Sequence, residues 1–407
     1  MRLAVLTQSA DRTGGVETYL QSVLPALADR YEVAFWSAST EISGRGAIAL
    51  PSSVQRLDLP AAPGDAARSL RAWHPDLLFA HGLDDPILEA AVLSVAPSVV
   101  VQHTYHGTCV SGGKTMTRPV VAQCTRPFGR GCLLQYFPRR CGGASPLTMA
   151  TLYRAQSLRL ATLKHATAVV TLSDHMAEEL RRNGVEGPRI HVVPPFVVPV
   201  CCGHGTPRRL SRETIRLLYM GRLEPLKGVR QLLLALPHVV SRSGRAVRLT
   251  VAGDGSQARP LAKLAASLRA ADERIHVAFI GWQQDAAKAR LFAEADALVM
   301  PSIWPEPFGL TGLEAATAGV PAVAFATGGI PEWLRDGENG SLAPAAGGCP
   351  ERLADAIVRC VESPEQLARL SDGARRSAAR WTLQRHLAGL HDVFGQATYK
   401  TRQTCLS

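Results

Sequence analysis

Long apolar runs are missing from this chain of 407 residues, and so is any Asp or Glu between Ala90 and Ser173. A helix that spans a bilayer needs about 20 consecutive apolar residues, and no stretch of the chain approaches that length. The first apolar run, Leu3 to Leu6, is followed directly by polar residues, so it is too short for a signal peptide and fits a first buried strand. We therefore expect a cytoplasmic protein.

The acid-free segment is strongly basic within a chain of net charge +11. Its cations are Lys114, Arg118, Arg126, Arg130, Arg139, Arg140, Arg154, Arg159 and Lys164. Such a stretch suggests an anionic neighbour, which could be nucleic acid, membrane phospholipid or a phosphorylated substrate. No helix-turn-helix, RNA-recognition or zinc-finger pattern occurs, so we expect no nucleic-acid partner. An anionic membrane surface, at the inner face of the plasma membrane, remains a candidate partner; the alternative is an ordinary solvated face.

Cysteines are concentrated in one segment, residues 104–146, but no Cys-x-x-Cys pair occurs. Four of the nine cysteines lie there: Cys109, Cys124, Cys132 and Cys141. In a cytosolic chain such a cluster favours a metal site over disulfides. The gaps of 14, 7 and 8 residues, however, match no zinc module. Two interpretations stay open: a structural zinc on these four thiolates, or four unrelated thiols.

The length predicts two domains of about 200 residues each. Short apolar strands alternate with helical segments, which predicts parallel sheets covered on both faces. We predict a first domain at residues 1–200, with 104–146 as a long basic loop, and a second domain at 214–381. A run rich in Pro, Cys and Gly marks residues 201–213 as the linker. Residues 382–407 have helical spacing.

Residues 296–325 predict a strand, a loop, a helix and a second strand. The three prolines between Pro301 and Pro307 exclude a helix or a central strand there. The pattern from Gly309 onward is helical, and Val320 to Phe325 is the next buried strand. In such a βαβ unit, ligands bind beyond the carboxyl ends of the strands. The proline-rich loop is therefore a candidate ligand site.

Two carboxylates belong to this unit, Glu306 in the loop and Glu314 on the helix. The helix start supplies the N–H groups of Gly309, Leu310 and Thr311, which suit a phosphate. The alternative is that Glu314 only interacts with the helix dipole and that Glu306 is a solvated loop residue.

Other loops after strands carry residues suited to phosphate. Arg222 and Lys227 follow the apolar strand Ile215–Met220. They can hold a diphosphate from two sides, or they can belong to a solvated loop. Gly14 and Gly15 stand between the first strand and a helix, where they allow close approach of the backbone to a ligand or simply form a turn.

His103 directly follows the predicted strand Ser98–Gln102, at the end where open α/β sheets present ligand-binding residues. The alternative is a hydrogen-bonded structural histidine. His106 lies three residues further on and has no such support.

Several motifs occur together and in a recognisable order: Gly221-Arg222-Leu223 with Lys227-Gly228, Gly253-Asp254-Gly255, Glu306-Pro307-Phe308-Gly309-Leu310, Leu313-Glu314-Ala315, Gly319-Val320-Pro321 and Gly328-Gly329-Ile330-Pro331-Glu332. This set resembles the donor-site signature of retaining glycosyltransferases of the GT-B fold, family 4 (glycosyl transferases group 1). The resemblance covers most of residues 214–381, and residues 1–213 match it more loosely.

The resemblance implies an α/β protein of GT-B fold, with two Rossmann-like domains facing a central cleft and a closing helix that crosses back to the first domain. It implies a retaining hexosyltransferase that moves a sugar from a nucleotide diphosphate sugar to an acceptor hydroxyl. We expect the acceptor to be a saccharide or a lipid-linked intermediate of cell-envelope polysaccharide synthesis. Two alternatives stay open: a nucleotide-sugar epimerase of the same fold, or a catalytically silent GT-B binding protein.

The resemblance also assigns roles to residues. Catalytic roles fall to His103, Arg222, Lys227 and Glu306, and donor-binding roles to Gly14, Gly15, Gly281, Gly309, Leu310, Thr311 and Glu314. His103 would contact the donor sugar, Glu306 would orient it, Glu314 would bind the ribose hydroxyls, and Gly281 would lie near the base. Arg222, Lys227 and the helix start would stabilise the leaving diphosphate, so that catalysis requires no cofactor.

Overall fold

The computed structural model describes residues 1–11, 15–39, 46–200, 211, 213–283 and 285–404. It divides into two compact units. The first unit comprises Met1–Gly113, Thr125–Pro194 and Leu383–Ser407, and the second comprises Lys114–Cys124 and Pro195–Thr382. Most of the predicted linker, 201–213, lies outside the described residues.

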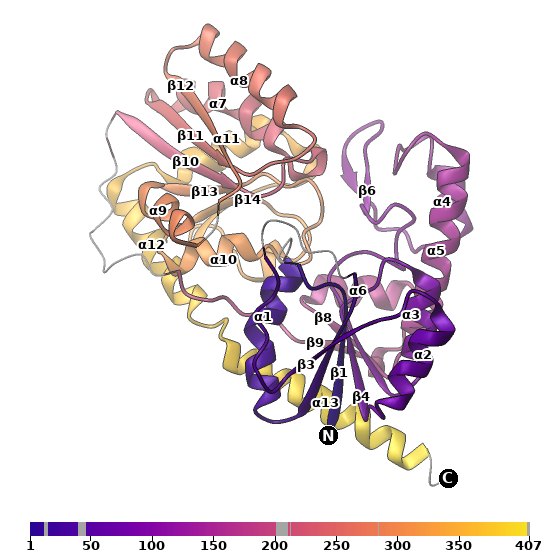
Figure 1. Ribbon diagram of the computed structural model, residues 1–407. Helices are drawn as coiled ribbons and strands as arrows, with labels where there is room; N and C mark the ends of the chain where they lie inside the picture. Colours follow the sequence, from indigo (N-terminus) through magenta and orange to yellow (C-terminus); the bar gives the residue numbers. More distant parts are fainter. Residues whose placement is uncertain (12–14, 40–45, 201–210, 212, 284, 405–407) are drawn as a thin grey trace. The chain divides into compact units, whose positions relative to one another are not determined.

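The first unit is built on a parallel sheet with the strand order β3-β2-β1-β4-β5-β8-β9 (Figure 1). Its strands are β1 (Arg2–Ser9), β2 (Glu32–Ser39), β3 (Gln55–Asp58), β4 (Leu77–Ala80), β5 (Ser98–Gln102), β8 (Ala168–Thr171) and β9 (Ile190–Val192). Its helices are α1 (Gly15–Ala28), α2 (Pro63–Ala72), α3 (Pro86–Leu93), α4 (Arg130–Gln135), α5 (Pro146–His165), α6 (Asp174–Arg182) and α13 (Leu383–Thr404).

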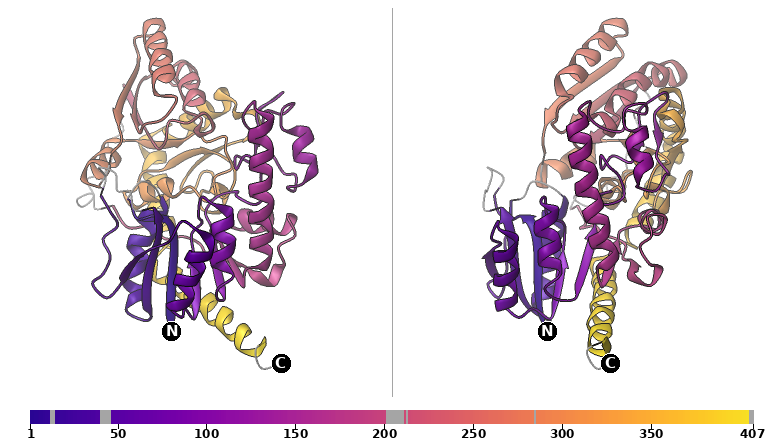
Figure 2. Two further views of the ribbon diagram at one scale, coloured as in Figure 1. Left: turned by 45° about the vertical axis from the view of Figure 1, so that its right-hand side comes forward. Right: turned by 90° about the vertical axis from the view of Figure 1, so that its right-hand side faces the viewer.

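The apolar strands of this sheet are buried on both faces, as a parallel sheet requires. In β1, Ala4 and Leu6 belong to a core cluster with residues of α2, α3, α5 and α6. On β4, Phe79 packs against Phe394 of α13, with ring centroids 5.0 Å apart. Helix α13 therefore contributes to the core of the first unit, beside β4 and β5 (Figures 1 and 2).

Hydrogen bonds hold α13 in the first unit. His386 Nδ1 is 2.8 Å from the Pro194 carbonyl oxygen, so this nitrogen carries the proton and donates it. His386 Nε2 then accepts from the Tyr19 hydroxyl of α1 at 2.8 Å. A second pair joins the Tyr31 hydroxyl to His391 Nδ1 at 2.8 Å.

The second unit holds another parallel sheet, with the strand order β12-β11-β10-β13-β14-β15. Its strands are β10 (Thr214–Met220), β11 (Ala246–Ala252), β12 (Ile275–Gly281), β13 (Ala297–Met300), β14 (Ala322–Phe325) and β15 (Gly340–Ala343). Its helices are α7 (Val229–Ser243), α8 (Ala258–Ala271), α9 (Asp285–Glu294), α10 (Leu310–Thr317), α11 (Pro350–Cys360) and α12 (Pro364–Ala378). One core cluster joins the sheet to α7, α8 and α11, and another joins it to α9 and α10.

The segment 104–146 contains little regular structure beyond an antiparallel hairpin and α4. The hairpin pairs β6 (Thr115–Met116) with β7 (Ala122–Gln123), and its residues are counted with the second unit. Among the described residues, no helix is both long enough and apolar enough to cross a bilayer.

Three buried histidines of the first unit, His81, His103 and His386, make its stability depend on pH. Burial lowers the pKa of His103 and of His386 to about 4 and lowers the pKa of His81 well below its ordinary value. An unfolded histidine has a pKa of about 6.5, so protonation favours the unfolded chain below that pH. The three histidines therefore leave the free energy of unfolding at its full value above about pH 6.5. Below that pH they lower it, and the loss grows as the pH falls toward 4.

We expect the free energy of unfolding, measured by urea denaturation from about pH 7.5 to about pH 4.5, to decrease as the pH is lowered. The variant His386→Gln should flatten this decrease, because glutamine takes up no proton and can still accept the Tyr19 hydrogen bond. The control is His165→Gln, the same substitution at an exposed residue of α5. A pH dependence that is the same in all three proteins would contradict the prediction.

Candidate active site

The carboxyl ends of β10 and β13 bring two predicted residues together. The two strands pair in parallel, so the loops that follow them leave the sheet side by side. Lys227 Nζ lies 2.7 Å from Glu306 Oε1, with 20% of the lysine side chain and 11% of the glutamate side chain exposed. Lys227 Nζ also lies 4.5 Å from the centroid of the Trp304 ring. The lysine charge is thus held between a carboxylate and an aromatic face.

Two glycines make this approach of the loops possible. A Cβ on Gly228, whose φ is +73°, would lie 1.8 Å from the Pro301 carbonyl oxygen. A Cβ on Gly328, whose φ is +60°, would lie 2.2 Å from the Glu306 carbonyl oxygen. That same Glu306 carbonyl accepts a hydrogen bond from the Gly329 amide at 2.8 Å. The backbone around Glu306 is therefore fixed by contacts that only glycine permits.

Helix α10 begins beside this pair. Gly309 precedes it in the left-handed conformation, with φ +90°, and no side chain among the described residues caps the helix. The Trp333 indole N–H donates to the Phe308 carbonyl at 2.7 Å, which holds the chain where the helix starts. The first N–H groups of α10, at Leu310 and Thr311, are therefore left for an anion.

Glu314, on the same helix, forms an ion pair with Lys288 of α9, and both side chains are partly exposed. Lys288 belongs to no motif and precedes Glu314 by a whole strand and loop, so the sequence offered no signal for it. The two carboxylates of the predicted site thus have separate cationic partners.

Arg222 and Gly281 lie at the same edge of the sheet, after β10 and at the end of β12. The Arg222 side chain is exposed, and its carbonyl accepts a hydrogen bond from the Tyr219 hydroxyl at 2.7 Å. Burial raises the pKa of Tyr219, so this hydroxyl stays protonated and donates. The Gly281 carbonyl accepts from the Gly253 amide at 2.8 Å, in a turn with φ +69° at Gly281. Tyr219, which belongs to none of the motifs, thus fixes the Arg222 loop.

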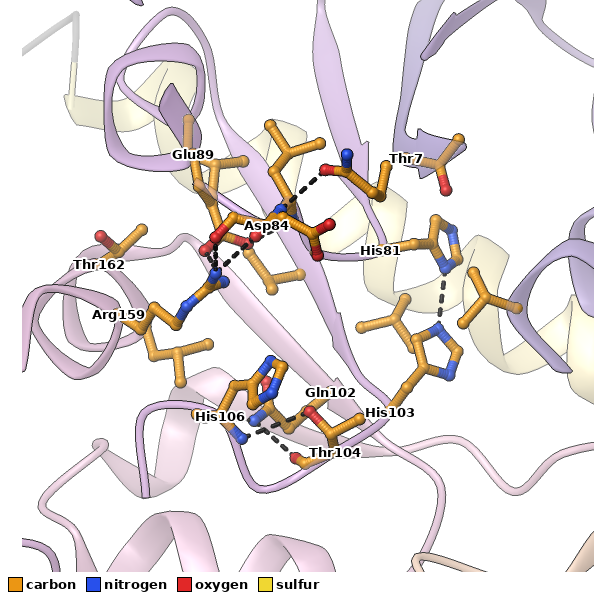
Figure 3. Close-up of a pocket in the computed structure, with 18 of the residues that line it drawn as sticks. Thr7, His81, Asp84, Glu89, Gln102, His103, Thr104, His106, Arg159 and Thr162 are labelled. Carbon is orange, nitrogen blue, oxygen red and sulfur yellow. Dashed lines mark hydrogen bonds and ion pairs between the residues drawn. The ribbon is translucent and has the colours of Figure 1, made fainter. Parts of the chain in front are cut away.

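The first unit has a cavity of about 160 Å³ at the carboxyl ends of β1, β4 and β5 (Figure 3). His103, which directly follows β5, lines it, with His81 of the neighbouring strand. His103 Nε2 is 2.9 Å from His81 Nδ1, and burial lowers the pKa of His103 to about 4. The two imidazoles are therefore neutral near pH 7 and share one hydrogen bond. The sequence could have predicted His81 as a site residue, because it directly follows β4 just as His103 directly follows β5.

Other predicted residues of the first unit lie nearby. The Gln102 amide donates to the Thr104 and His106 carbonyls at 2.8 and 2.6 Å, which fixes the turn after His103. Gly15 begins α1, whose first turn contributes Glu17 to the cavity. Gly14 lies outside the described residues.

The zinc site on four cysteines stays a prediction. Cys109 is buried beside the Ser111 hydroxyl, and the sulfurs of Cys132 and Cys141 face the carbonyls of Pro127 and Gln135. Cys124 belongs to the second unit. Within the part of the chain that the structure describes, no three His, Cys, Asp or Glu side chains gather as a metal site.

Two parallel α/β units, each with polar residues at the carboxyl ends of its strands, define the chain as a GT-B fold protein. Solved structures share the fold across almost the whole chain. Anabaena Alr3699/HepE in complex with UDP and glucose has a TM-score of 0.68 at 19% identity, covering 97% of this chain and 99% of that one. Sucrose-phosphate synthase from Thermosynechococcus elongatus has a TM-score of 0.70 at 18% identity, covering 97% and 98%.

Family models match both units, "Glycosyltransferase Family 4" over residues 13–199 and "Glycosyl transferases group 1" over residues 208–377. The chain belongs to the group 1, family 4 glycosyltransferases. A D-inositol 3-phosphate glycosyltransferase of Xylanimonas cellulosilytica is 34% identical over 246 residues, which are 57% of either chain. A glycogen synthase of Mycobacterium tuberculosis is 37% identical over 172 residues, 42% of this chain and 39% of the relative. The matched part thus spans 57% of the length of the first relative and 39% of the length of the second.

The contact at Gly228 can be tested by substitution. Gly244, which ends α7, shares its left-handed backbone, with φ +69°, but nothing lies within 4 Å of where its Cβ would be. Gly244→Ala should cost about 1 to 2 kcal/mol of stability, the strain of that backbone conformation. Gly228→Ala must also displace the Pro301 carbonyl and should cost on the order of 4 kcal/mol or prevent folding.

Urea denaturation of both variants beside the unchanged protein measures the difference. Equal losses at the two positions would show that the loops after β10 and β13 do not approach each other as the structure has them.

Proposed function

We propose that the protein transfers a glycosyl group from a nucleotide diphosphate sugar to an acceptor hydroxyl, with retention of the anomeric configuration. The observation that carries this proposal is the Lys227–Glu306 pair at the carboxyl ends of β10 and β13, beside the uncapped start of α10. The relatives add support, since the two curated ones quoted are named a glycosyltransferase and a glycogen synthase, and one structural neighbour is solved in complex with UDP and glucose.

In the proposed reaction, the bond between the sugar C1 and a diphosphate oxygen breaks while C1 bonds to the acceptor oxygen. Negative charge then develops on the leaving diphosphate, and the acceptor's proton ends on that diphosphate or in water. Lys227 and Arg222 supply positive charge in one loop, and the first amides of α10 supply N–H donors. Because these groups can stabilise the leaving charge themselves, we expect turnover without a metal cofactor.

Glu306 and Glu314 have different proposed tasks. Glu306 holds the Lys227 ammonium and presents its second oxygen to hydroxyls of the donor sugar. Glu314 lies further along α10 and would accept hydrogen bonds from the ribose, with Lys288 fixing the carboxylate. His103, neutral near pH 7, would hydrogen-bond a hydroxyl of the sugar; Gly15 and Gly281 would allow the backbone close approach to the donor.

The donor is found first, by thermal stabilisation with a panel of nucleotide diphosphate sugars, since a ligand that binds the native state raises the unfolding temperature. Release of nucleoside diphosphate, with and without saccharide acceptors, then measures transfer. Recovery of an epimerised sugar without transfer would contradict the proposal in favour of an epimerase. Binding without any turnover would indicate a binding protein.

With that assay, Lys227→Ala and Arg222→Ala should each lower turnover about 100- to 1,000-fold, like the loss of one preorganised donor to a developing anion. Lys227→Arg keeps the charge beside Glu306 and should recover part of the loss. Lys263→Ala, at an exposed position of α8, is the matched control. Melting curves should show all four variants folded. Normal turnover of Lys227→Ala on the same substrates would remove the assignment.

We further propose that the basic segment of the first unit attaches the protein to an anionic membrane, where it meets a saccharide or lipid-linked acceptor of cell-envelope polysaccharide synthesis. Apolar side chains are exposed among the cations of this segment: Leu134 in α4 is 76% exposed and Leu147 in α5 is 80% exposed. By contrast, Leu163 is buried and Leu160 packs against the core, so these leucines of α5 serve the fold. A basic surface with exposed leucines combines the two attractions that interfacial binding uses.

Liposome co-sedimentation tests this attachment. Each basic residue near an anionic surface contributes about 1 kcal/mol, so binding to anionic vesicles should appear at low salt and fall as salt rises. Replacement of four arginines by Gln should weaken it: Arg126, Arg130, Arg139 and Arg140. The control removes the same charge from exposed arginines of α8 and α12: Arg259, Arg269, Arg369 and Arg376. Equal weakening by the two sets, or equal binding to neutral vesicles, would exclude this membrane surface.

A further inference from the structure

The cavity of the first unit contains one cation among its described lining residues, Arg159 of α5 (Figure 3). Its side chain is only 9% exposed. An arginine in a candidate substrate pocket of a basic protein would ordinarily suggest a phosphate site. The contacts of this arginine point the other way.

Arg159 is fully engaged with the protein around it. One guanidinium nitrogen, Nη1, lies 2.6 Å from Glu89 Oε2, and Glu89 is equally buried. The other, Nη2, donates to the carbonyls of Leu83 and Asp84, both at 2.6 Å. Glu89 Oε1 in turn accepts from the Leu83 amide at 3.2 Å. The arginine therefore holds the loop between β4 and α3, and its charge is balanced in place.

The remaining charges of the cavity are negative. Asp84 and Glu17 also line it, and both are carboxylates. The histidines add no positive charge near pH 7, because burial lowers the pKa of His103 and of His81. The described lining residues thus carry a net negative charge, and among them Arg159 is the one cation and is already paired, so an anionic group that enters meets repulsion from them.

Hydroxyl groups of a ligand, in contrast, can find both hydrogen-bond donors and hydrogen-bond acceptors in the cavity. Asp84 offers carboxylate oxygens, Thr7 and Thr104 offer hydroxyls that donate or accept, and the imidazole of His106 does the same through its two nitrogens. Charged carboxylate and neutral imidazole partners suit an uncharged polyol, whose hydroxyls need both donors and acceptors.

We propose that this cavity receives the reacting part of the acceptor as a neutral polyhydroxy group, a sugar or cyclitol without phosphate, and that the Arg159–Glu89 pair together with Asp84 excludes the phosphorylated form. The proposal rests on the proposed transfer function and adds the acceptor class to it. It separates this chain from relatives named for D-inositol 3-phosphate. A lipid-linked acceptor is compatible with it where the receiving sugar is uncharged.

The first test compares matched acceptors with the full-length protein: myo-inositol against inositol 3-phosphate, and glucose against glucose 6-phosphate. Binding is measured by saturation-transfer NMR, and transfer by release of nucleoside diphosphate above the acceptor-free rate. We expect a neutral member to bind and to accept, and its phosphorylated counterpart to be at least about tenfold weaker. Equal or better binding of the phosphorylated members, or no binding of any member, overturns the proposal.

The second test changes the charge of the cavity. Glu89→Gln leaves Arg159 without a counter-charge, and Asp84→Asn removes an exposed carboxylate from the same lining. Each should strengthen binding of inorganic phosphate at least about tenfold over the unchanged protein. Because Glu89→Gln breaks a buried pair and can cost several kcal/mol, Asp84→Asn serves where that variant does not fold. Glu178→Gln, on α6, breaks exposed pairs with Arg181 and Arg182 and is the control that should leave phosphate binding unchanged.

The two readouts separate failure of this inference from failure of the proposed function. Neutral acceptors that bind without any transfer would contradict glycosyl transfer and leave the selectivity of the cavity supported. Transfer to phosphorylated acceptors would support the function and overturn the selectivity. Unchanged phosphate binding in the folded charge variants would show that Asp84 and Glu89 do not exclude anions.

Discussion

The close contact between the loops that follow β10 and β13 determines the candidate active site of the second unit. The Pro301 carbonyl occupies the space where any residue but glycine would place a Cβ at position 228. Lys227, the preceding residue, is thereby brought within 2.7 Å of Glu306. Without that backbone approach, the ammonium and the carboxylate would be two separate solvated groups, each with little effect on a bound diphosphate.

Two ion pairs of similar length differ in the exposure of their cations and in the partners around them. The Lys227 side chain is 20% exposed, so a ligand can reach the lysine, while Glu306 at 11% is nearly as buried as Glu89. Arg159 and Glu89 are each 9% exposed and are surrounded by backbone partners, so their charges cancel inside the protein. Residue type alone would have made Arg159 the better phosphate ligand; its partners make it a structural residue.

In the first unit, too, the fold decides which polar side chains are in contact. His81 and His103 follow adjacent parallel strands, so a hydrogen bond between them requires only the sheet order. The cysteines between 109 and 141 lie close in sequence, yet three of their sulfurs have other polar neighbours: the Ser111 hydroxyl for Cys109, the Pro127 carbonyl for Cys132 and the Gln135 carbonyl for Cys141.

The sequence by itself determined the α/β class, the family and most of the central strands, because apolar runs bounded by Gly and Pro report burial directly. Ser98–Gln102 was predicted with its observed bounds, and the start of the helix after Gly309 was predicted to within a residue. The strands β3 and β15 were missed, since Gln55–Asp58 is polar at a sheet edge and Gly340–Ala343 contains three small residues. Only the tertiary structure decided which side chains meet: Lys288 with Glu314, and Glu89 with Arg159. Those pairs join residues from different elements, and their distances depend on strand order and helix packing, which local patterns do not encode.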